Sequence, residues 1–307
     1  MLYLNKYHLK RLEEKDFPAV KEIFWKVFHK KVSLSYLKNK YNTSYLGVKY
    51  ICSIAYKGKI PVAFYGAIPQ KFSNHSQEIL VAHACDSFTL KECQGQGLHF
   101  QLATISYELM KENNIKFVYA YHSDNTYHST KKLGWKEHIH MQRFHVKVPT
   151  LPISKILNKL GSNSFYTLFF SEKISKEALE KLQSNSSQFR QKFTKSFIDY
   201  KNSFNNHFFI ELYDCVFWVK IQSIMNIGLV QAPSETSLKK ATRKLRRIAF
   251  FLGIKELLFQ IDSATPVASY LTKIVVPKKS WLIGYLDFDP TINLEEFLFT
   301  YADLDTY

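Results

Sequence analysis

A glycine turn at residues 94–97 constrains this chain most, because it stands between a predicted strand and a predicted helix. The strand is expected at residues 78–88. Apolar residues then recur at intervals of four, three and four, at Leu98, Leu102, Ile105 and Leu109. That spacing places them on one face of a helix of about three turns. Residues 115–121 read IKFVYAY, a continuous apolar run typical of a strand buried on both faces. The four elements together predict mixed α/β structure.

The turn itself reads ECQGQGL at residues 92–98. A strand that enters a helix through glycines leaves free backbone N–H groups at the helix N-terminus, where the helix dipole favours a phosphate. Glycine also allows a ligand to approach the backbone closely. The turn is not a dinucleotide-binding G-x-G-x-x-G, because Phe100 occupies the third glycine position, and no Walker lysine follows. A tight turn without a ligand is the alternative reading.

The rest of the first half alternates strands and helices. Strands are expected at residues 7–12, 50–56, 60–70 and 136–148, and helices at 16–31, 34–41 and 126–132. Residues 149–190 contain PTLP, SNS and SNSSQ, which indicate a connector with helical pieces such as 176–183.

The second half of the sequence repeats features of the first half. SYLKNKYN at 35–42 is similar to SFIDYKNS at 196–203, and the helix end and buried strand around IKFVYAY are similar to FLGIKELLFQIDSATP in the second half. The interval between the two features is 22 residues shorter in the second copy. We therefore predict an internal repeat, with domains at 1–148 and 191–307 and a connector at 149–190.

The charge balance points to anionic partners. The chain has 42 Lys and Arg against 26 Asp and Glu, a net charge of +16. Such a protein attracts nucleic acid, an anionic membrane surface or a phosphorylated ligand, although lysines also serve solubility. The run KKATRKLRR at 239–247 has its basic residues on one helix face, which is either a solvated face or a site for an anion.

Cysteine spacing and hydropathy argue against a metal-binding, secreted or membrane-spanning protein. The four cysteines, at positions 52, 85, 93 and 215, form no CxxC pair and no zinc-spaced Cys/His array. Four histidines, at positions 122, 128, 138 and 140, also lack metal-ligand spacing, so no metal site is expected. Reduced thiols indicate a cytoplasmic protein. The N-terminus is too charged for a signal peptide, and no run of about 18 apolar residues predicts a transmembrane span.

The order of elements resembles the GNAT acyltransferase superfamily. The matching motifs are GQGLHFQL at 95–102, IKFVYAY at 115–121 and KKLGW at 131–135. The resemblance covers residues 7–148 and, as a degenerate copy, the second half, as in two-lobed bacterial members of the superfamily. It implies a central mixed sheet flanked by helices in each lobe.

The resemblance implies acyl-CoA as cofactor, most often acetyl-CoA. The pyrophosphate is expected on the backbone amides of Gln94, Gly95, Gln96, Gly97 and Leu98. The pantetheine arm is expected beside Phe88, Thr89 and Leu90, where that strand would splay from 115–121. Asn125 would hold the pantetheine or cap its own helix. Glu92 stands where Gln or Arg is usual, so we expect its carboxylate to point away from the pyrophosphate.

Acyl transfer to an amine needs a base and an acid. Asp86, our preference, and His83 are the candidates for the base. They are three residues apart, so in a regular strand they point to opposite faces and at most one faces the cleft. The family's frequent acid, a tyrosine, is replaced here by Thr130, and Tyr127 one turn earlier is the substitute. For each residue a structural role is the alternative reading: a surface or turn-capping side chain for Asp86 and His83, and a packing tyrosine for Tyr127.

These residues predict an N-acyltransferase that moves an acetyl group from acetyl-CoA to a small-molecule or peptide amine by direct attack in a ternary complex. Cys85 and Cys93 lack the His/Asp partners of a thiol nucleophile. The alternatives are an aminoacyl transferase that uses aminoacyl-tRNA, which suits the positive charge, and a non-catalytic module that binds acyl-CoA or a polyanion. In the second half the helix at 238 is preceded by QAPSETS, without glycine. That lobe is expected to bind no CoA and to shape the acceptor cleft.

Overall fold

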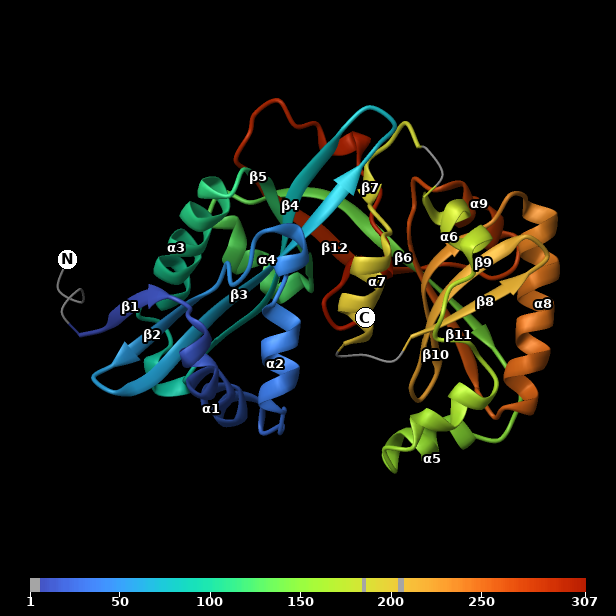
Figure 1. The fold of residues 1–307 in the computed structure, drawn as a ribbon, viewed down its shortest axis with the longest axis horizontal. Helices are drawn as coiled ribbons and strands as arrows, with labels where there is room; N and C mark the ends of the chain where they lie inside the picture. Colours follow the sequence, from blue (N-terminus) through green and yellow to red (C-terminus); the bar gives the residue numbers. More distant parts are fainter. Residues whose placement is uncertain (1–5, 184–185, 204–206) are drawn as a thin grey trace.

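A computed structural model describes residues 6–183, 186–203 and 207–307, without the side chains of residues 124, 125 and 163. Two lobes share one sheet of 12 strands, with helices packed against it (Figure 1). The strand order is β1-β2-β3-β4-β5-β12-β6-β11-β10-β9-β8, and β7 pairs with β3. The predicted mixed α/β architecture is confirmed.

The first lobe contains strands β1 (His8–Arg11), β2 (Ser53–Lys57), β3 (Ile60–Ser73), β4 (Glu78–Thr89), β5 (Ile115–His122) and β6 (Lys136–Lys147). Its helices are α1 (Phe17–Phe28), α2 (Leu34–Tyr41), α3 (Leu98–Glu112) and α4 (Asp124–Lys131). The connection between the lobes holds α5 (Ile153–Lys159), α6 (Lys176–Gln183) and β7 (Arg190–Gln191).

The second lobe contains strands β8 (Phe208–Leu212), β9 (Cys215–Ile221), β10 (Met225–Gln231), β11 (Glu256–Asp262) and β12 (Lys278–Asp287). Its helices are α7 (Lys195–Asn202), α8 (Glu235–Phe251) and α9 (Pro266–Thr272). No helix in the described part of the chain combines the length and apolar character needed to cross a bilayer.

The two lobes exchange a strand. β12 of the second lobe pairs antiparallel with β5 of the first, and β6 of the first pairs antiparallel with β11 of the second. Counted outward from these central strands, β12-β5-β4-β3-β2 repeats the arrangement of β6-β11-β10-β9-β8. The order of strands therefore follows the repeat read from the sequence. The boundaries at residues 148 and 190 stay predictions, since the sheet runs through both lobes without a break.

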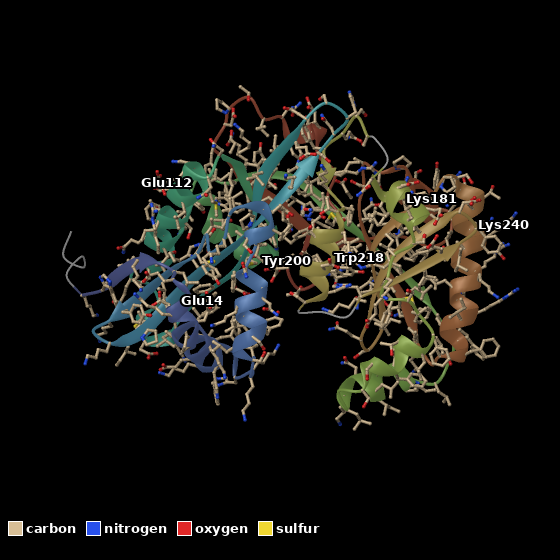
Figure 2. All side chains as sticks on the ribbon, in the orientation of Figure 1. Glu14, Glu112, Lys181, Tyr200, Trp218 and Lys240 are labelled. Carbon is tan, nitrogen blue, oxygen red and sulfur yellow. The ribbon has the colours of Figure 1, made fainter. Side chains whose placement is uncertain are left out.

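The two similar segments at 35–42 and 196–203 form helices α2 and α7. Each begins at a hydroxyl N-cap: Ser33 accepts from the Tyr36 amide, and Thr194 accepts from the Phe197 amide. The helices also contact each other, because the Tyr200 hydroxyl donates to the Lys40 carbonyl at 2.5 Å. Figure 2 shows Tyr200 where the lobes meet. The repeat thus contributes to the contact between the lobes.

Residues 299–307 fill a gap in the second lobe. β10 pairs with β11 only from Met225 to Ile227, although both strands continue. Beyond that point the Tyr307 ring covers Gly228, and the Tyr307 hydroxyl donates to the Trp218 carbonyl at 2.6 Å. A Cβ atom on Gly228 would lie 2.0 Å from Tyr307 Cζ. The glycine is therefore required by the ring packed against it.

Two buried lysines bind the backbone of the same segment. Lys201 Nζ donates to the Leu304 carbonyl and Lys220 Nζ donates to the Thr306 carbonyl, each at 2.7 Å. Burial lowers the pKa of Lys201 to about 7 and that of Lys220 to about 8. Residues 299–307 are thus held by polar contacts from α7 and β9 as well as by aromatic packing.

We predict that Gly228→Ala lowers the free energy of unfolding by about 1–3 kcal/mol, because the added methyl group overpacks against the Tyr307 ring. Denaturant unfolding at equilibrium measures this cost. In a Tyr307→Ala background the same change should cost much less, since the clashing ring is gone. An equal cost in both backgrounds would contradict the contact.

We also predict that the free energy of unfolding rises between pH 7 and about pH 8, below the range in which unfolded thiols and tyrosines begin to lose protons. Lys201 has a pKa of about 7 in the folded protein and an ordinary value of 10.5, so in that window the unfolded chain binds more protons. Lys201→Met should reduce the slope, whereas Lys195→Met, an exposed change on the same helix, should leave it as in the wild type. A slope unaffected by Lys201→Met would refute the assignment.

Candidate active site

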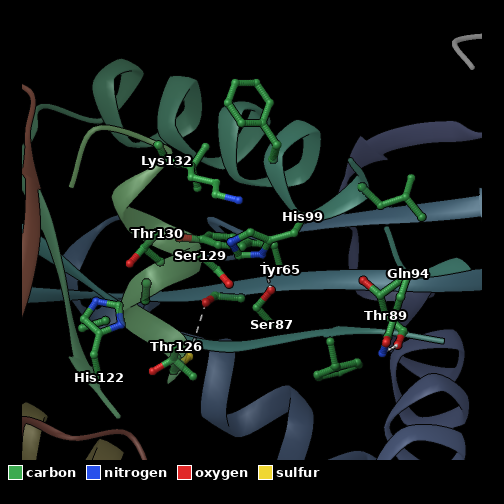
Figure 3. A pocket seen from close by; sticks show the side chains of 18 of the residues that line it. Tyr65, Ser87, Thr89, Gln94, His99, His122, Thr126, Ser129, Thr130 and Lys132 are labelled. Carbon is green, nitrogen blue, oxygen red and sulfur yellow. Dashed lines mark hydrogen bonds between the residues drawn. The ribbon is translucent and has the colours of Figure 1, made fainter. Parts of the chain in front are cut away.

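β4 and β5 splay apart within the first lobe. Their parallel pairing ends at His83 and Tyr119, although β4 runs on to Thr89 and β5 to His122. A cavity of about 730 Å³ opens between the diverging strands and is lined by β4, β5, α4 and the start of α3 (Figure 3). The splay expected from the resemblance is present at the predicted place.

The cavity reaches the glycine turn. Gly95 and Gly97 adopt left-handed φ values of 72° and 74°, which glycine accommodates without strain. Among the described residues, no backbone or side-chain group accepts a hydrogen bond from the amides of residues 95–100. The Gln94 amide differs, because it donates to the Lys91 carbonyl at 3.3 Å. Unpaired amides at the positive end of a helix form an anion site.

Glutamine side chains hold this turn in shape. Gln96 Nε2 donates to the Glu92 carbonyl at 3.2 Å, and Gln96 Oε1 accepts from the Tyr7 hydroxyl at 2.6 Å. Gln94 Nε2 donates to the Thr89 carbonyl at 3.1 Å. Glu92 is exposed and does not line the cavity, as expected from its charge. The turn is therefore held in shape by its own side chains and by Tyr7, the residue that precedes β1.

Most of the predicted cofactor residues line the cavity: Phe88, Thr89, Gln94, Gly95, Gly97 and Leu98. Leu90 does not, because it is buried and its amide donates to the Val62 carbonyl at 2.9 Å. Gln96 acts on the turn rather than on the cavity. The side chain of Asn125 lies outside the described residues.

Asp86 and His83 lie on the same face of the sheet, contrary to the expectation from strand alternation. The register between β3 and β4 shifts between Ala84 and Ser87, so that Cys85 and Asp86 together oppose the single residue Gly66. Such a β-bulge inserts one residue and reverses the alternation beyond it. Cys85 lines the cavity, whereas Asp86 and His83 do not.

Both residues belong to a buried group that we call the interlobe ionic cluster: Lys40, His83, Asp86 and Asp305. Lys40 Nζ lies 2.6 Å from Oδ2 of Asp86 and 2.6 Å from Oδ2 of Asp305. His83 Nε2 lies 3.2 Å from Asp305 Oδ1. Burial opposes the charge on Lys40, but the Asp305 and Asp86 carboxylates outweigh it and raise its pKa.

One oxygen of Asp86 is left available. Lys40 and the Tyr41 hydroxyl both donate to Oδ2, and within the described residues Oδ1 has no hydrogen-bond partner. The Asp86 side chain is 19% exposed, which admits a ligand. Cys85, Asp86 and Asp305 are near enough to ligate a metal ion, but the Lys40 ammonium occupies the space between the two carboxylates.

The Tyr127 hydroxyl does not face the cavity, as a catalytic acid for the leaving thiolate would have to. Its hydroxyl donates to the Trp135 carbonyl at 3.3 Å, and its ring packs against His122. Tyr127 does not line the cavity, whereas Thr126, Ser129 and Thr130 of the same helix do (Figure 3).

Two histidines in the cavity were not singled out from the sequence. His99 Nδ1 lies 2.7 Å from Ser87 Oγ, and the Nε2 atoms of His99 and His122 are buried without a hydrogen-bond partner in the described part (Figure 3). Burial lowers the pKa of both, that of His122 to about 4. Their positions in the sequence could have indicated them. His99 comes just after the glycine turn, and His122 is the last residue of the buried strand β5.

Comparisons with known proteins bear on the family and the fold. Residues 8–137 match a family model described as an acetyltransferase (GNAT) domain. No curated protein sequence matches the chain significantly.

Solved structures share the fold over nearly the whole chain. A probable N-acyltransferase from Enterococcus faecalis is 10% identical, with a TM-score of 0.65 over 94% of this chain and 75% of that one. A GCN5-related N-acetyltransferase from Kribbella flavida is 12% identical, with a TM-score of 0.60 over 91% and 70%. N-myristoyltransferase from Saccharomyces cerevisiae is 10% identical, with a TM-score of 0.59 over 99% and 86%.

At these identities the structures establish the fold, while the family model establishes the membership of the first lobe. Residues 8–137 are therefore a domain of the GNAT acetyltransferase superfamily, set within a two-lobed fold like that of N-myristoyltransferase.

Proposed function

We propose that the protein is an acyl-CoA-dependent N-acyltransferase that moves an acetyl group from acetyl-CoA to an amine. The observation that carries the proposal is the continuity of the cavity. It runs from the unpaired amides of residues 95–100 into the gap where β4 leaves β5. One end suits a pyrophosphate, and the other suits an extended chain that adds to an open strand edge.

The residues present fit acyl-CoA. The amides of Gly95, Gly97 and Leu98 would hold the pyrophosphate, and Lys132, which also lines the cavity, adds positive charge (Figure 3). Phe88 and Thr89 would flank the pantetheine arm. When bound, acyl-CoA supplies an activated thioester, and the protein has to orient it and manage protons.

We assign proton removal from the acceptor amine to Asp86. Its Oδ2 accepts hydrogen bonds from Lys40 and Tyr41. These bonds fix the carboxylate and leave Oδ1 available to accept a proton from the amine. It lies at the bulge beside the splay, and its carboxylate is within 4.8 Å of the sulfur of Cys85, a residue that lines the cavity. An amine bound at Oδ1 would therefore lie next to the cavity in which the thioester would be held. His83 then acts as a positioning residue through Asp305.

The leaving thiolate needs a proton. Tyr127 stays the proposed acid, and its hydroxyl would have to leave the Trp135 carbonyl, to which it is bonded at 3.3 Å, to reach the cavity. Ser129 and Thr130 on the same helix already line the cavity and can relay a proton from water.

We further propose one CoA site per chain. In the second lobe the start of α8 is capped by Ser234, which accepts from the Ser237 amide at 3.1 Å, and the gap between β10 and β11 is covered by Tyr307. An aminoacyl transferase has no need of the amide cradle at residues 95–100, and a binding module has no need of Asp86. Assays of acetyl-CoA consumption across an amine library separate these alternatives.

Gly97→Val is predicted to weaken acetyl-CoA binding by at least about 100-fold, because a side chain at the turn strains the cradle and crowds the phosphate. Isothermal titration calorimetry measures the dissociation constant. Gly58→Val is the matched control, since Gly58 is also left-handed at φ 59° with open space around it, but lies in the β2–β3 turn. Similar losses in both variants would argue against the site.

Asp86→Asn is predicted to lower kcat by about 10²–10⁴-fold while leaving the acetyl-CoA dissociation constant unchanged, since the amide cannot take a proton. Steady-state kinetics with an acceptor found in the library screen measures this. Cys85→Ala, the neighbouring cavity residue, should retain activity because the attack is direct. Activity lost in Cys85→Ala and kept in Asp86→Asn would reverse the assignment.

A further inference from the structure

Exposed apolar side chains gather at one end of the second lobe. Among the described residues, 15 large hydrophobic side chains are exposed, and nine of them come from two segments: Leu151, Ile153, Ile156, Leu160, Phe165, Leu168, Phe169, Phe250 and Phe251. Leu168 and Phe251 are 75% and 79% exposed. A monomeric soluble protein seldom leaves such a set together in water without a partner.

The two segments form one surface. The Ser154 amide donates to the Gly253 carbonyl at 3.1 Å, and the Thr150 hydroxyl donates to the Phe250 carbonyl at 2.6 Å. The Tyr166 hydroxyl reaches the Leu252 carbonyl at 3.4 Å. These bonds attach α5 and the residues after it to the C-terminal end of α8, as Figure 1 shows. We call the exposed side chains of residues 151–169 and 243–255 the α5–α8 surface.

The same region is strongly basic. Residues 148–171 and 236–255 contain no Asp or Glu, yet they contain nine Lys and Arg: Lys155, Lys159, Lys239, Lys240, Arg243, Lys244, Arg246, Arg247 and Lys255. None of the nine has a carboxylate within 4.0 Å in the described part of the chain. Lys240 points away from the protein (Figure 2). The two acids that adjoin residues 236–255 are already paired: Glu235 with Lys273, and Glu256 with Lys147 and His145.

Arginine and phenylalanine side chains lie side by side at the centre of this surface. Arg243, Arg246 and Arg247 line a shallow groove together with Phe250 and Phe251, and Pro149 lies on its other side. Phenylalanine and leucine flanked by Lys and Arg are the composition of protein surfaces that lie in the interface of an anionic bilayer. The apolar groups enter the boundary between headgroups and acyl chains, while the basic groups stay at the phosphates.

We propose that the α5–α8 surface binds the surface of an anionic lipid bilayer, so that the protein works as a peripheral membrane protein. A nucleic acid suits the charges but not the exposed Leu151, Leu160 and Leu168, which neither stack on bases nor form hydrogen bonds with them. A bilayer accepts both kinds of side chain at once. The inference is independent of the proposed acyl transfer, because no residue of this surface lines the cavity.

Vesicle co-sedimentation with the full chain tests this inference. We expect binding to vesicles of phosphatidylcholine with about one-third phosphatidylglycerol, and little binding to phosphatidylcholine alone. Arg243→Gln/Arg246→Gln/Arg247→Gln should weaken binding by about 100-fold, because three charges leave the bilayer surface. Leu168→Ser/Phe251→Ser should weaken it by about tenfold or more.

Matched variants away from the surface control for general charge and hydrophobicity. Lys57→Gln/Lys59→Gln/Lys278→Gln removes three exposed charges, and Ile60→Ser removes an exposed apolar side chain in the first lobe. Both should bind vesicles like the wild type, and all variants should keep the wild-type thermal unfolding midpoint.

Four results would overturn the inference. The first is failure of the wild type to bind anionic vesicles. The second is an equal loss in the control charge variant, which means non-specific adsorption. The third is unchanged vesicle binding by Leu168→Ser/Phe251→Ser while tRNA competes for the wild type, which assigns the basic residues to nucleic acid. If sedimentation equilibrium shows that the wild type forms a dimer that this variant breaks, the surface belongs to a second copy of the chain.

Discussion

The loss of backbone pairing between β4 and β5 after His83 and Tyr119 is the constraint on which the rest of the first lobe depends. Two strands that part expose edge N–H and C=O groups, which need a partner. Helices α3 and α4, together with Val27 and Phe28 of α1, turn the gap into a cavity, and Lys40 and Tyr41 of α2 bind Asp86 at the bulge. The second lobe has the same divergence between β10 and β11, and there the protein supplies its own partner, Tyr307.

The difference between the lobes follows from local sequence. Glycines at positions 95 and 97 leave amides unpaired at the start of α3, whereas Ser234 caps α8 with its own hydroxyl. Residues 301–307 also connect the lobes electrostatically, since Asp305 reaches Lys40 and His83 across the interface. Burial of the Lys40 and Asp305 charges is tolerated because the two groups lie at hydrogen-bond distance from each other. The second lobe therefore completes the proposed acceptor side of the first.

Local patterns predicted much of this structure. The helices at 34–41 and 176–183 occur with the predicted bounds, because hydroxyl caps and helical spacing are encoded nearby in the sequence. The glycine turn and the splayed strands were also expected. The bulge at Cys85 and Asp86 was not, and it moved Asp86 and His83 to one face. The partners of Asp86, from α2, and of His83, from residue 305, are fixed by long-range packing that no local pattern contains. His122 was considered only as a metal ligand, since its burial in the cavity depends on where the partner strands lie.

The strand exchange has a consequence for how the chain folds during synthesis. Leu282 of β12 pairs with His122 of β5, 160 positions earlier. The first lobe thus emerges with the β5 edge open, and it stays so until Lys278–Asp287 of β12 have been made. Closure over such a separation is slow, and an open strand edge invites pairing with other chains. Nascent chains of this protein should therefore depend on chaperones until β12 is available, and any shortened form that lacks β12 should be prone to aggregate.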